Sequence, residues 1–298
     1  MARAHDEIRG RLGRVGVWTF AFDALRPRAI AEDVRSVEAL GFPSLWIPEG
    51  GGSSDVLTSL SWLLGATERL TIASGIANIT ARAPEVLARG AAFLTEAYDA
   101  RLVLGVGVGH EYTTERRGRE WADPLERMRG YLDAMDEAAG DRPPSPRVLA
   151  ALGDGMLRLS AGRALGAHTY FVPPEHTAHA RSVLGPEAVL AVEQGVMLTP
   201  DADGARRSGR AWTTHYLDLP NYARNWARLG FEDELSGGGS DRLVDAALAW
   251  GNVDQAVARV KAHLDAGADH VCVQLILDDE SDFGLAWFQE LTPALLAL

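Results

Sequence analysis

Leu102-Val103-Leu104-Gly105-Val106-Gly107-Val108 is the clearest strand in this sequence, and Gly109-His110 follows it directly. An apolar run of this length is typical of a strand that is buried on both faces. Similar short runs lie on both sides of it, at residues 14–18, 44–48, 70–76, 147–152, 167–172, 189–198 and 270–276. Helical segments separate these runs. Since strands buried on both faces need helices over a parallel sheet, eight such units predict an α/β fold, a (β/α)8 TIM barrel.

The segments between the predicted strands have the spacing of amphipathic helices. Pro27 begins one of them and Gly41 ends it. In the helix after the third strand, the expected buried stripe consists of Val86, Leu87, Phe93 and Leu94. A mostly helical stretch at about residues 200–250 precedes the last strand. We expect it to be an insertion in a single barrel domain that spans residues 1–298.

The composition excludes several classes of protein. The chain has 298 residues, a net charge of -12 and one cysteine, Cys272, which excludes a disulfide framework and a cysteine-based metal site. No apolar run approaches the ~20 residues of a membrane span, and residues 1–7 lack the apolar segment of a signal peptide. We therefore expect a cytoplasmic protein without membrane contact. The acidic balance argues against nucleic-acid binding, and since Lys261 is the only lysine, a ligand phosphate must be met by Arg, His or backbone amides.

In a barrel of this kind, chemistry lies where strands end and the following loops begin. Glu49 follows the second predicted strand, and its carboxylate is a candidate acid, base or substrate anchor. The alternative for Glu49 is a solvated loop residue. His110 follows the fourth strand directly, where a neutral imidazole could transfer a proton or hydrogen-bond a ring carbonyl. Glu49 and His110 are the predicted catalytic residues.

The fourth strand also has a bare face. Gly105, Gly107 and Gly109 are two residues apart, so one face of the strand carries no side chains. Such a face indicates either the close approach of a ligand or tight packing inside the barrel, and both interpretations stay open. The segment is not a dinucleotide fingerprint, because His110 and Tyr112 stand where a third glycine is needed.

Two segments are candidate anion sites. Gly153-Asp154-Gly155-Met156 lies between the fifth strand and a helix, where free amides and a helix N-terminus favour an anion. The alternative is an Asp154 N-cap with glycine turns. At the start of another helix, His176 and Thr177 could contact a phosphate or cap the helix. His176 and His179 are three residues apart, but a third ligand is missing, so we predict no metal.

Aromatic and basic residues suggest further ligand contacts. Trp18, at the end of the first strand, and Tyr222 could form an aromatic wall for a flat ligand on the substrate side. The alternative is that both belong to the core. Arg116, Arg117 and Arg119 form either a solvated face or a contact for an anionic tail at the rim of the barrel.

Several of these segments together resemble the bacterial luciferase-like superfamily. Within it, they are most similar to the oxidoreductases that use the deazaflavin coenzyme F420. The segments that carry the resemblance are residues 15–18, 46–49, 73–84, 102–110, 151–153, 170–177 and 266–271. They extend over nearly the whole chain and are specific as a set.

The resemblance implies a bacterial luciferase-like barrel with a deazaflavin or flavin at the C-terminal mouth of its strands. Relatives often have a non-proline cis peptide in the third strand, behind the ring, and here it would fall at or near Ser74-Gly75. The cofactor-binding residues implied near the ring and its ribityl chain are Ser74, Gly75, Ile76, Asn78, Val108, Gly109 and His110. Those implied near the phosphate are Gly153, Asp154, Gly155, Met156, His176 and Thr177.

One departure limits what the resemblance implies about the substrate. In the sugar-phosphate dehydrogenase of this family, a His ends the second strand and a Glu ends the fourth. Here Glu49 and His110 stand in those places, so the residue types are exchanged, and lysines for a substrate phosphate are absent. A sugar phosphate is therefore not the expected substrate.

The resulting prediction is an oxidoreductase that transfers a hydride between coenzyme F420 and a small organic substrate. One alternative is an FMN-dependent luciferase-like monooxygenase, which activates oxygen and needs a reductase partner. Another is a non-catalytic flavin-binding barrel protein. The resemblance also makes a homodimer plausible as the assembly.

Overall fold

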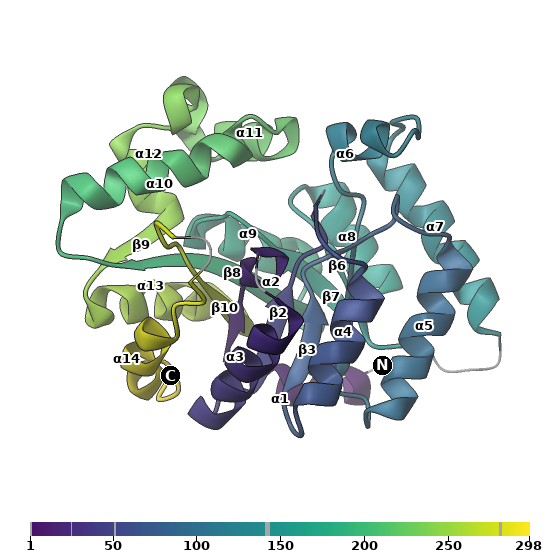
Figure 1. Ribbon diagram of the computed structural model, residues 1–298. Coiled ribbons are helices and arrows are strands. Elements are labelled where there is room, and N and C mark those ends of the chain that lie inside the picture. The colour runs from purple at the N-terminus through teal and green to yellow at the C-terminus, as the bar shows by residue number, and fades with distance from the viewer. Residues whose placement is uncertain (1, 25, 51, 141–143, 280–281) are drawn as a thin grey trace.

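The computed structural model describes residues 2–24, 26–50, 52–140, 144–279 and 282–298, and it contains a closed parallel barrel (Figure 1). The barrel strands are β1 (Val15–Trp18), β2 (Ser44–Ile47), β3 (Thr71–Ser74), β5 (Leu102–Gly107), β6 (Arg147–Ala150), β7 (Gly166–Thr169), β8 (Val189–Leu198) and β10 (His270–Leu275). Each strand pairs with the next in parallel, and β10 pairs with both β8 and β1, which closes the barrel. The predicted (β/α)8 barrel is confirmed.

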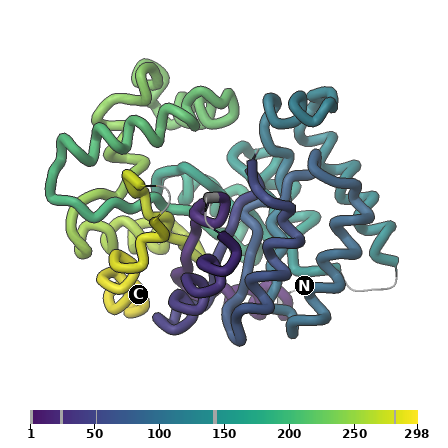
Figure 2. Tube along the Cα trace, in the orientation of Figure 1, coloured from purple at the N-terminus to yellow at the C-terminus, as the bar shows by residue number. Residues whose placement is uncertain are grey.

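Helices cover the outside of this barrel. They are α3 (Pro27–Leu40), α4 (Val56–Ala66), α5 (Pro84–Ala97), α7 (Pro124–Ala139), α8 (Asp154–Arg163), α9 (Pro174–Leu184), α13 (Val253–Asp265) and α14 (Leu285–Leu295). Short α2 (Ala21–Ala24) and α6 (Glu111–Arg116) lie in the loops that follow β1 and β5. The C-terminal α14 packs against α3, so the last helix of the outer layer lies beside the first one (Figure 2). None of the helices in the described ranges is long and apolar enough to cross a membrane.

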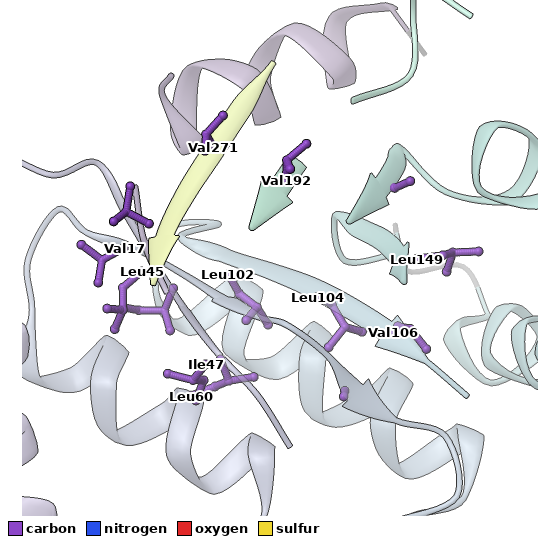
Figure 3. Close-up of a cluster of buried hydrophobic side chains, with 14 of the residues drawn as sticks. Val17, Leu45, Ile47, Leu60, Leu102, Leu104, Val106, Leu149, Val192 and Val271 are labelled. Atoms are coloured by element: carbon purple, nitrogen blue, oxygen red, sulfur yellow. The ribbon is translucent and has the colours of Figure 1, made fainter. Parts of the chain in front are cut away.

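Alternate residues of each strand point outward and form the main core with the helices. Figure 3 shows this layer, in which Leu45 and Ile47 of β2 lie next to Leu60 of α4. Leu102 and Leu104 of β5 belong to the same layer. Because side chains alternate along a strand, the residues between these positions fill the barrel interior.

The interior is closed at one end by α1 (Ala2–Leu12), a helix that the sequence patterns did not predict. Its Ile8 and Leu12 join Trp18, Trp46 and Val103 in a separate buried cluster. Figure 1 shows α1 at the end of the barrel opposite α6 and α10–α12. The C-terminal mouth is therefore the end that remains for a ligand.

The predicted insertion lies over this mouth. It contains α10 (Ala202–Leu217), α11 (Pro220–Trp226), a π-helical turn (Ala227–Phe231), 3-10 turns (Glu232–Glu234 and Ser236–Gly238) and α12 (Asp241–Ala247). The helical insertion is confirmed, but its predicted last residues instead form a short strand, β9 (Leu248–Gly251), which pairs with β8. The strand forms there because β8 is ten residues long and extends beyond its barrel neighbours.

The predicted stripe of α5 is wrong at two positions. Leu87 and Leu94 are buried as expected, but Val86 is 51% exposed and Phe93 is 66% exposed. Ala91 shares the buried face instead, because residues 87, 91 and 94 follow the helical repeat. Val86 and Phe93 each precede a buried leucine by one residue, so they are rotated toward solvent by about 100°.

Candidate functional site

The third predicted strand is interrupted at the mouth of the barrel. β3 ends at Ser74, and after two intervening residues β4 (Ala77–Asn78) pairs with β5. The peptide bond between Gly75 and Ile76 is cis. The cis bond expected at or near Ser74-Gly75 is thus present, one residue further along the chain. We call residues 74–78 the bulge.

The bare face of β5 accommodates this bulge. A Cβ atom on Gly105 would overlap the carbonyl oxygen of Ser74, and one on Gly107 would collide with the side chain of Ile76. A Cβ atom on Gly109 would overlap the Asn78 amide. Of the two interpretations of the glycines, tight packing therefore accounts for all three positions. The Ser74 hydroxyl also belongs to this contact, because it donates to the Gly105 carbonyl at 2.8 Å.

Glu49 is held in a buried network behind the bulge. Its carboxylate forms an ion pair with Arg82, whose guanidinium also contacts Asp55 at 2.9 Å. The same carboxylate accepts from the backbone N–H groups of Asn78 at 2.8 Å and Val56 at 3.2 Å. The solvated-loop alternative for Glu49 is therefore wrong. Glu49 links the bulge to the start of α4, and its role in proton transfer stays a prediction.

His110 lies at the end of β5, half-buried among aromatic rings. Its ring centroid is 5.8 Å from that of Tyr222 and 6.0 Å from that of Tyr112. The His110 carbonyl accepts from the Thr113 hydroxyl at 2.8 Å, which fixes the start of α6. Burial lowers the pKa of His110, and a hydrogen bond with Asn221 opposes this effect. The imidazole is therefore neutral at pH 7, as the sequence argument assumed.

The structure brings Trp18 and Tyr222 together through Tyr170. The Tyr170 ring centroid is 5.1 Å from that of Trp18 and 6.2 Å from that of Tyr222. The Tyr170 hydroxyl donates to Gln274 Oε1 at 2.8 Å and lies 2.6 Å from the Tyr216 hydroxyl. Trp18 is 1% exposed and Tyr222 is 9% exposed, and each belongs to a buried cluster, so the alternative that both are core residues is confirmed. The partly buried Tyr170 joins them into an aromatic wall between β1, the end of β7 and the insertion.

Glu193 is a buried ionisable residue beside this wall that the sequence patterns missed. It is 1% exposed, its Oε2 accepts from the Phe171 N–H at 3.1 Å, and its Oε1 has no partner in the described structure. Burial raises the pKa of Glu193 to about 8. The carboxyl group is therefore mostly protonated at pH 7. The available signal was an ionisable residue, followed by Gln194, within a strand at residues 189–198 whose other residues are apolar or glycine.

No side chain caps the N-terminus of α8, as a candidate anion site requires. Its N-cap is Gly153, which has no capping side chain, so the alternative of an Asp154 N-cap is wrong. Asp154 instead pairs with His179 at 2.7 Å and with Arg158 at 2.9 Å. The other predicted histidine, His176, places Nε2 at 2.9 Å from the Leu152 carbonyl. Across the described ranges, there is no group of three or more His, Cys, Asp or Glu side chains placed for a metal ion.

Two predicted phosphate contacts have other partners. The Thr177 hydroxyl is fully buried and lies 2.8 Å from Nδ1 of His263, so it joins α9 to α13. Met156 packs against the main core, and its carbonyl accepts from Ser160 at 2.7 Å. In the rim cluster, Arg117 donates to the Thr80 hydroxyl at 3.0 Å, next to the bulge. Among the predicted phosphate contacts at the start of α8, the backbone groups of Gly153 and Gly155 therefore remain.

Known proteins share this fold over nearly the whole chain. The family model described as luciferase-like monooxygenase matches residues 13–270. An F420-dependent glucose-6-phosphate dehydrogenase of Amycolatopsis mediterranei (strain U-32) is 24% identical over 324 residues, which is 91% of this chain and 96% of that protein.

Two solved structures illustrate the range of the fold. An F420-dependent secondary alcohol dehydrogenase in complex with an F420-acetone adduct has a TM-score of 0.73 at 18% identity, over 95% of this chain and 98% of that chain. The oxygenating constituent of 3,6-diketocamphane monooxygenase from Pseudomonas putida, in complex with FMN, has a TM-score of 0.68 at 16% identity. The match covers 94% of this chain and 95% of that chain. With the family match over most of its length, this chain belongs to the luciferase-like monooxygenase family of oxidoreductases.

Proposed function

We propose that this protein is a deazaflavin-dependent oxidoreductase, which transfers a hydride between coenzyme F420 and a small organic substrate. The observation that carries the proposal is the match over 91% of the chain to a relative named as F420-dependent. The fold alone does not separate F420 from FMN, since solved structures with each of them are similar to this one.

The residues at the mouth fit a flat ring with a phosphate-bearing tail. Ile76 and Asn78 of the bulge lie against Gly107 and Gly109 at the end of β5, and together with Val108 they would hold the ring. The first amides of α8, after the uncapped Gly153, would hold the phosphate. When bound, a deazaflavin supplies a ring carbon that accepts or releases a hydride.

The chain's own residues supply the proton and the position of the substrate. His110 holds or accepts, at an imidazole nitrogen, the proton that accompanies the hydride, because the ring is neutral and stands at a strand end. Tyr170, partly buried between the rings of Trp18 and Tyr222, provides the aromatic surface against which a small substrate is placed. Glu49 keeps the bulge in position through the Asn78 N–H group.

The glucose-6-phosphate of the relative's name is not proposed as the substrate. Lys261, the only lysine, is an exposed residue of α13 that pairs with Asp265 at 2.6 Å. No lysine is therefore available at the mouth for a sugar phosphate. A small, uncharged organic substrate suits the aromatic wall better.

Parallel titrations with F420 and FMN test this proposal. Binding is followed by intrinsic Trp fluorescence and by cofactor absorbance. We expect micromolar binding of F420 and much weaker binding of FMN, after which reduced and oxidised F420 are used to screen small alcohols and ketones. Preference for FMN would instead indicate the monooxygenase alternative, and binding of neither cofactor would contradict the proposal.

A further inference from the structure

One arginine of the insertion lies over the uncapped N-terminus of α8. Arg228 belongs to the π-helical turn that follows α11. Its two terminal guanidinium nitrogens are 3.6 and 3.8 Å from the position that a Cβ atom would take on Gly153. Insertion and barrel therefore meet at the first turn of α8, through residues that are 75 positions apart in the sequence.

The charges at this contact have the same sign. The free N–H groups at a helix N-terminus carry a partial positive charge, and the guanidinium carries a full one. Within the described part of the chain, Arg228 has no carboxylate partner, and its hydrogen bond goes to Oδ1 of Asn225 at 3.3 Å. Asp154, the acidic residue of the first turn, is already paired with His179 and Arg158. An anion between Arg228 and α8 would satisfy both positive groups.

A buried amide next to Arg228 points to the same ligand independently. Asn225 is 2% exposed, and its Nδ2 has no hydrogen-bond partner in the described structure. Buried donors without a partner are rare in folded proteins, and an anion oxygen would provide one. His176 does not supply the charge, because burial lowers its pKa to about 4 and leaves it neutral at pH 7.

We propose that Arg228, with the Nδ2 group of Asn225, binds the phosphate of the cofactor against the first amides of α8. The bound phosphate then ties the insertion to the barrel. This inference rests on the proposed function, since it needs a cofactor that carries a phosphate. It adds a residue of the insertion to the contacts that the sequence assigns to the α8 segment.

Affinity measurements on two matched variants test the inference. R228Q and R224Q each remove one exposed positive charge from the insertion, and the two positions are one helical turn apart. The ligands are F420, its phosphate-free deazaflavin chromophore, FMN and riboflavin. We expect R228Q to weaken binding of the phosphate-bearing ligands about 10-fold or more, as the loss of a charged hydrogen bond implies. Binding of the phosphate-free ligands should be unchanged, R224Q should resemble the wild type, and R228K should recover part of the affinity.

A second measurement does not depend on the cofactor. Inorganic phosphate should slow chymotrypsin cleavage of the insertion in the wild type and in R224Q, but not in R228Q. If R228Q loses affinity equally for phosphate-bearing and phosphate-free ligands, Arg228 has a merely structural role and the inference is overturned. Unchanged affinities in R228Q would overturn it while leaving the proposed function intact. If the wild type binds neither cofactor, the proposed function fails, and the phosphate protection alone then supports or contradicts the anion site.

Discussion

At the residue scale, the two predicted catalytic side chains stand in opposite surroundings. Glu49 faces the guanidinium of Arg82 and two backbone N–H groups, all of which favour a fixed carboxylate. His110 faces aromatic rings, which favour the neutral imidazole. A fixed ion pair is suited to holding structure, whereas a neutral imidazole is suited to moving a proton. The two residues are therefore expected to respond differently to substitution.

The conservative variant E49Q distinguishes a structural role of Glu49 from a role in proton transfer. Removing one partner of a buried ion pair leaves the other unpaired, and such changes cost about 3–5 kcal/mol of stability. We expect a comparable loss in the free energy of unfolding, measured by urea denaturation, and weaker cofactor binding because Asn78 is released. In the cycle with R82Q, the double variant should lose less than the sum of the single losses. Unchanged stability with a reduced kcat would instead indicate a proton-transfer role.

For His110, the expected defect is in turnover. H110Q should bind the cofactor within about threefold of the wild type, while kcat falls about 10²- to 10⁴-fold, the range for loss of a general acid or base. Since burial lowers the pKa of His110 below 6.5, the wild-type rate should decline only on the acidic side of that value. Steady-state kinetics from pH 5 to 8 measure both effects. A wild-type kcat in H110Q would remove His110 from the mechanism.

At the scale of elements, the mouth depends on how closely β5 approaches the bulge. Gly105 and Gly107 present only backbone to Ser74 and Ile76, and the pairing of β4 with β5 continues beyond the interruption. Any side chain at these positions would have to displace backbone or buried atoms. The glycines therefore allow the bulge to exist, and the bulge in turn sets the floor of the proposed ring site.

The variant G105A is expected to destabilise the protein strongly. Its added Cβ would meet the Ser74 carbonyl oxygen, which belongs to backbone and cannot move freely, so we expect a loss of about 3 kcal/mol. The matched control is G130A in α7, where nothing lies within 4 Å of the added atom. There the higher helix propensity of alanine should stabilise by about 0.5–1 kcal/mol. Thermal unfolding of both variants checks the contrast, and equal effects would contradict the packing argument.

At the scale of the whole molecule, buried ionisable groups make stability depend on pH. Burial lowers the pKa of His168 and His263 to about 3, and of His176 and His270 to about 4. Between these values and pH 6.5, the unfolded chain binds protons that the folded protein does not, so stability rises with pH. Glu193 acts in the opposite direction, because its pKa is raised to about 8. From pH 4.5 to 8 the folded protein keeps a proton that the unfolded chain has lost.

The free energy of unfolding should therefore be greatest near pH 6.5. Below that pH the four histidines dominate, and above it Glu193 lowers stability by up to about 1.4 kcal/mol per pH unit. In E193Q, the decline between pH 6.5 and 8 should be largely lost, and the rise between pH 5 and 6.5 should be steeper than in the wild type, because Glu193 opposes the histidines there. Urea denaturation at pH 5, 6.5 and 8 measures these slopes. An equal decline above pH 6.5 in both proteins would contradict the assignment to Glu193.

The sequence by itself determined the barrel, and it predicted a candidate site at the mouth of the barrel. Apolar runs such as residues 102–108, separated by helical segments, require a parallel sheet with helices over it, and this requirement is local and repeats along the chain. The strand-end positions of Glu49, His110 and Gly153 follow from the same register. Periodicity was less reliable on helices. Phe93 was predicted to be buried but is exposed, because it lies one residue away from the buried face.

Only the tertiary structure decided which side chains meet and how they are charged. Arg82 reaches Glu49 across 33 residues, and Arg228 reaches Gly153 across 75, because closing the barrel and folding the insertion over it bring these segments together. Likewise, Glu193 is protonated at neutral pH because the surrounding fold removes water from its carboxyl group. Local patterns report which face of a strand or helix is buried. The partner found on that face depends on distant segments, and so does the chemistry of the site.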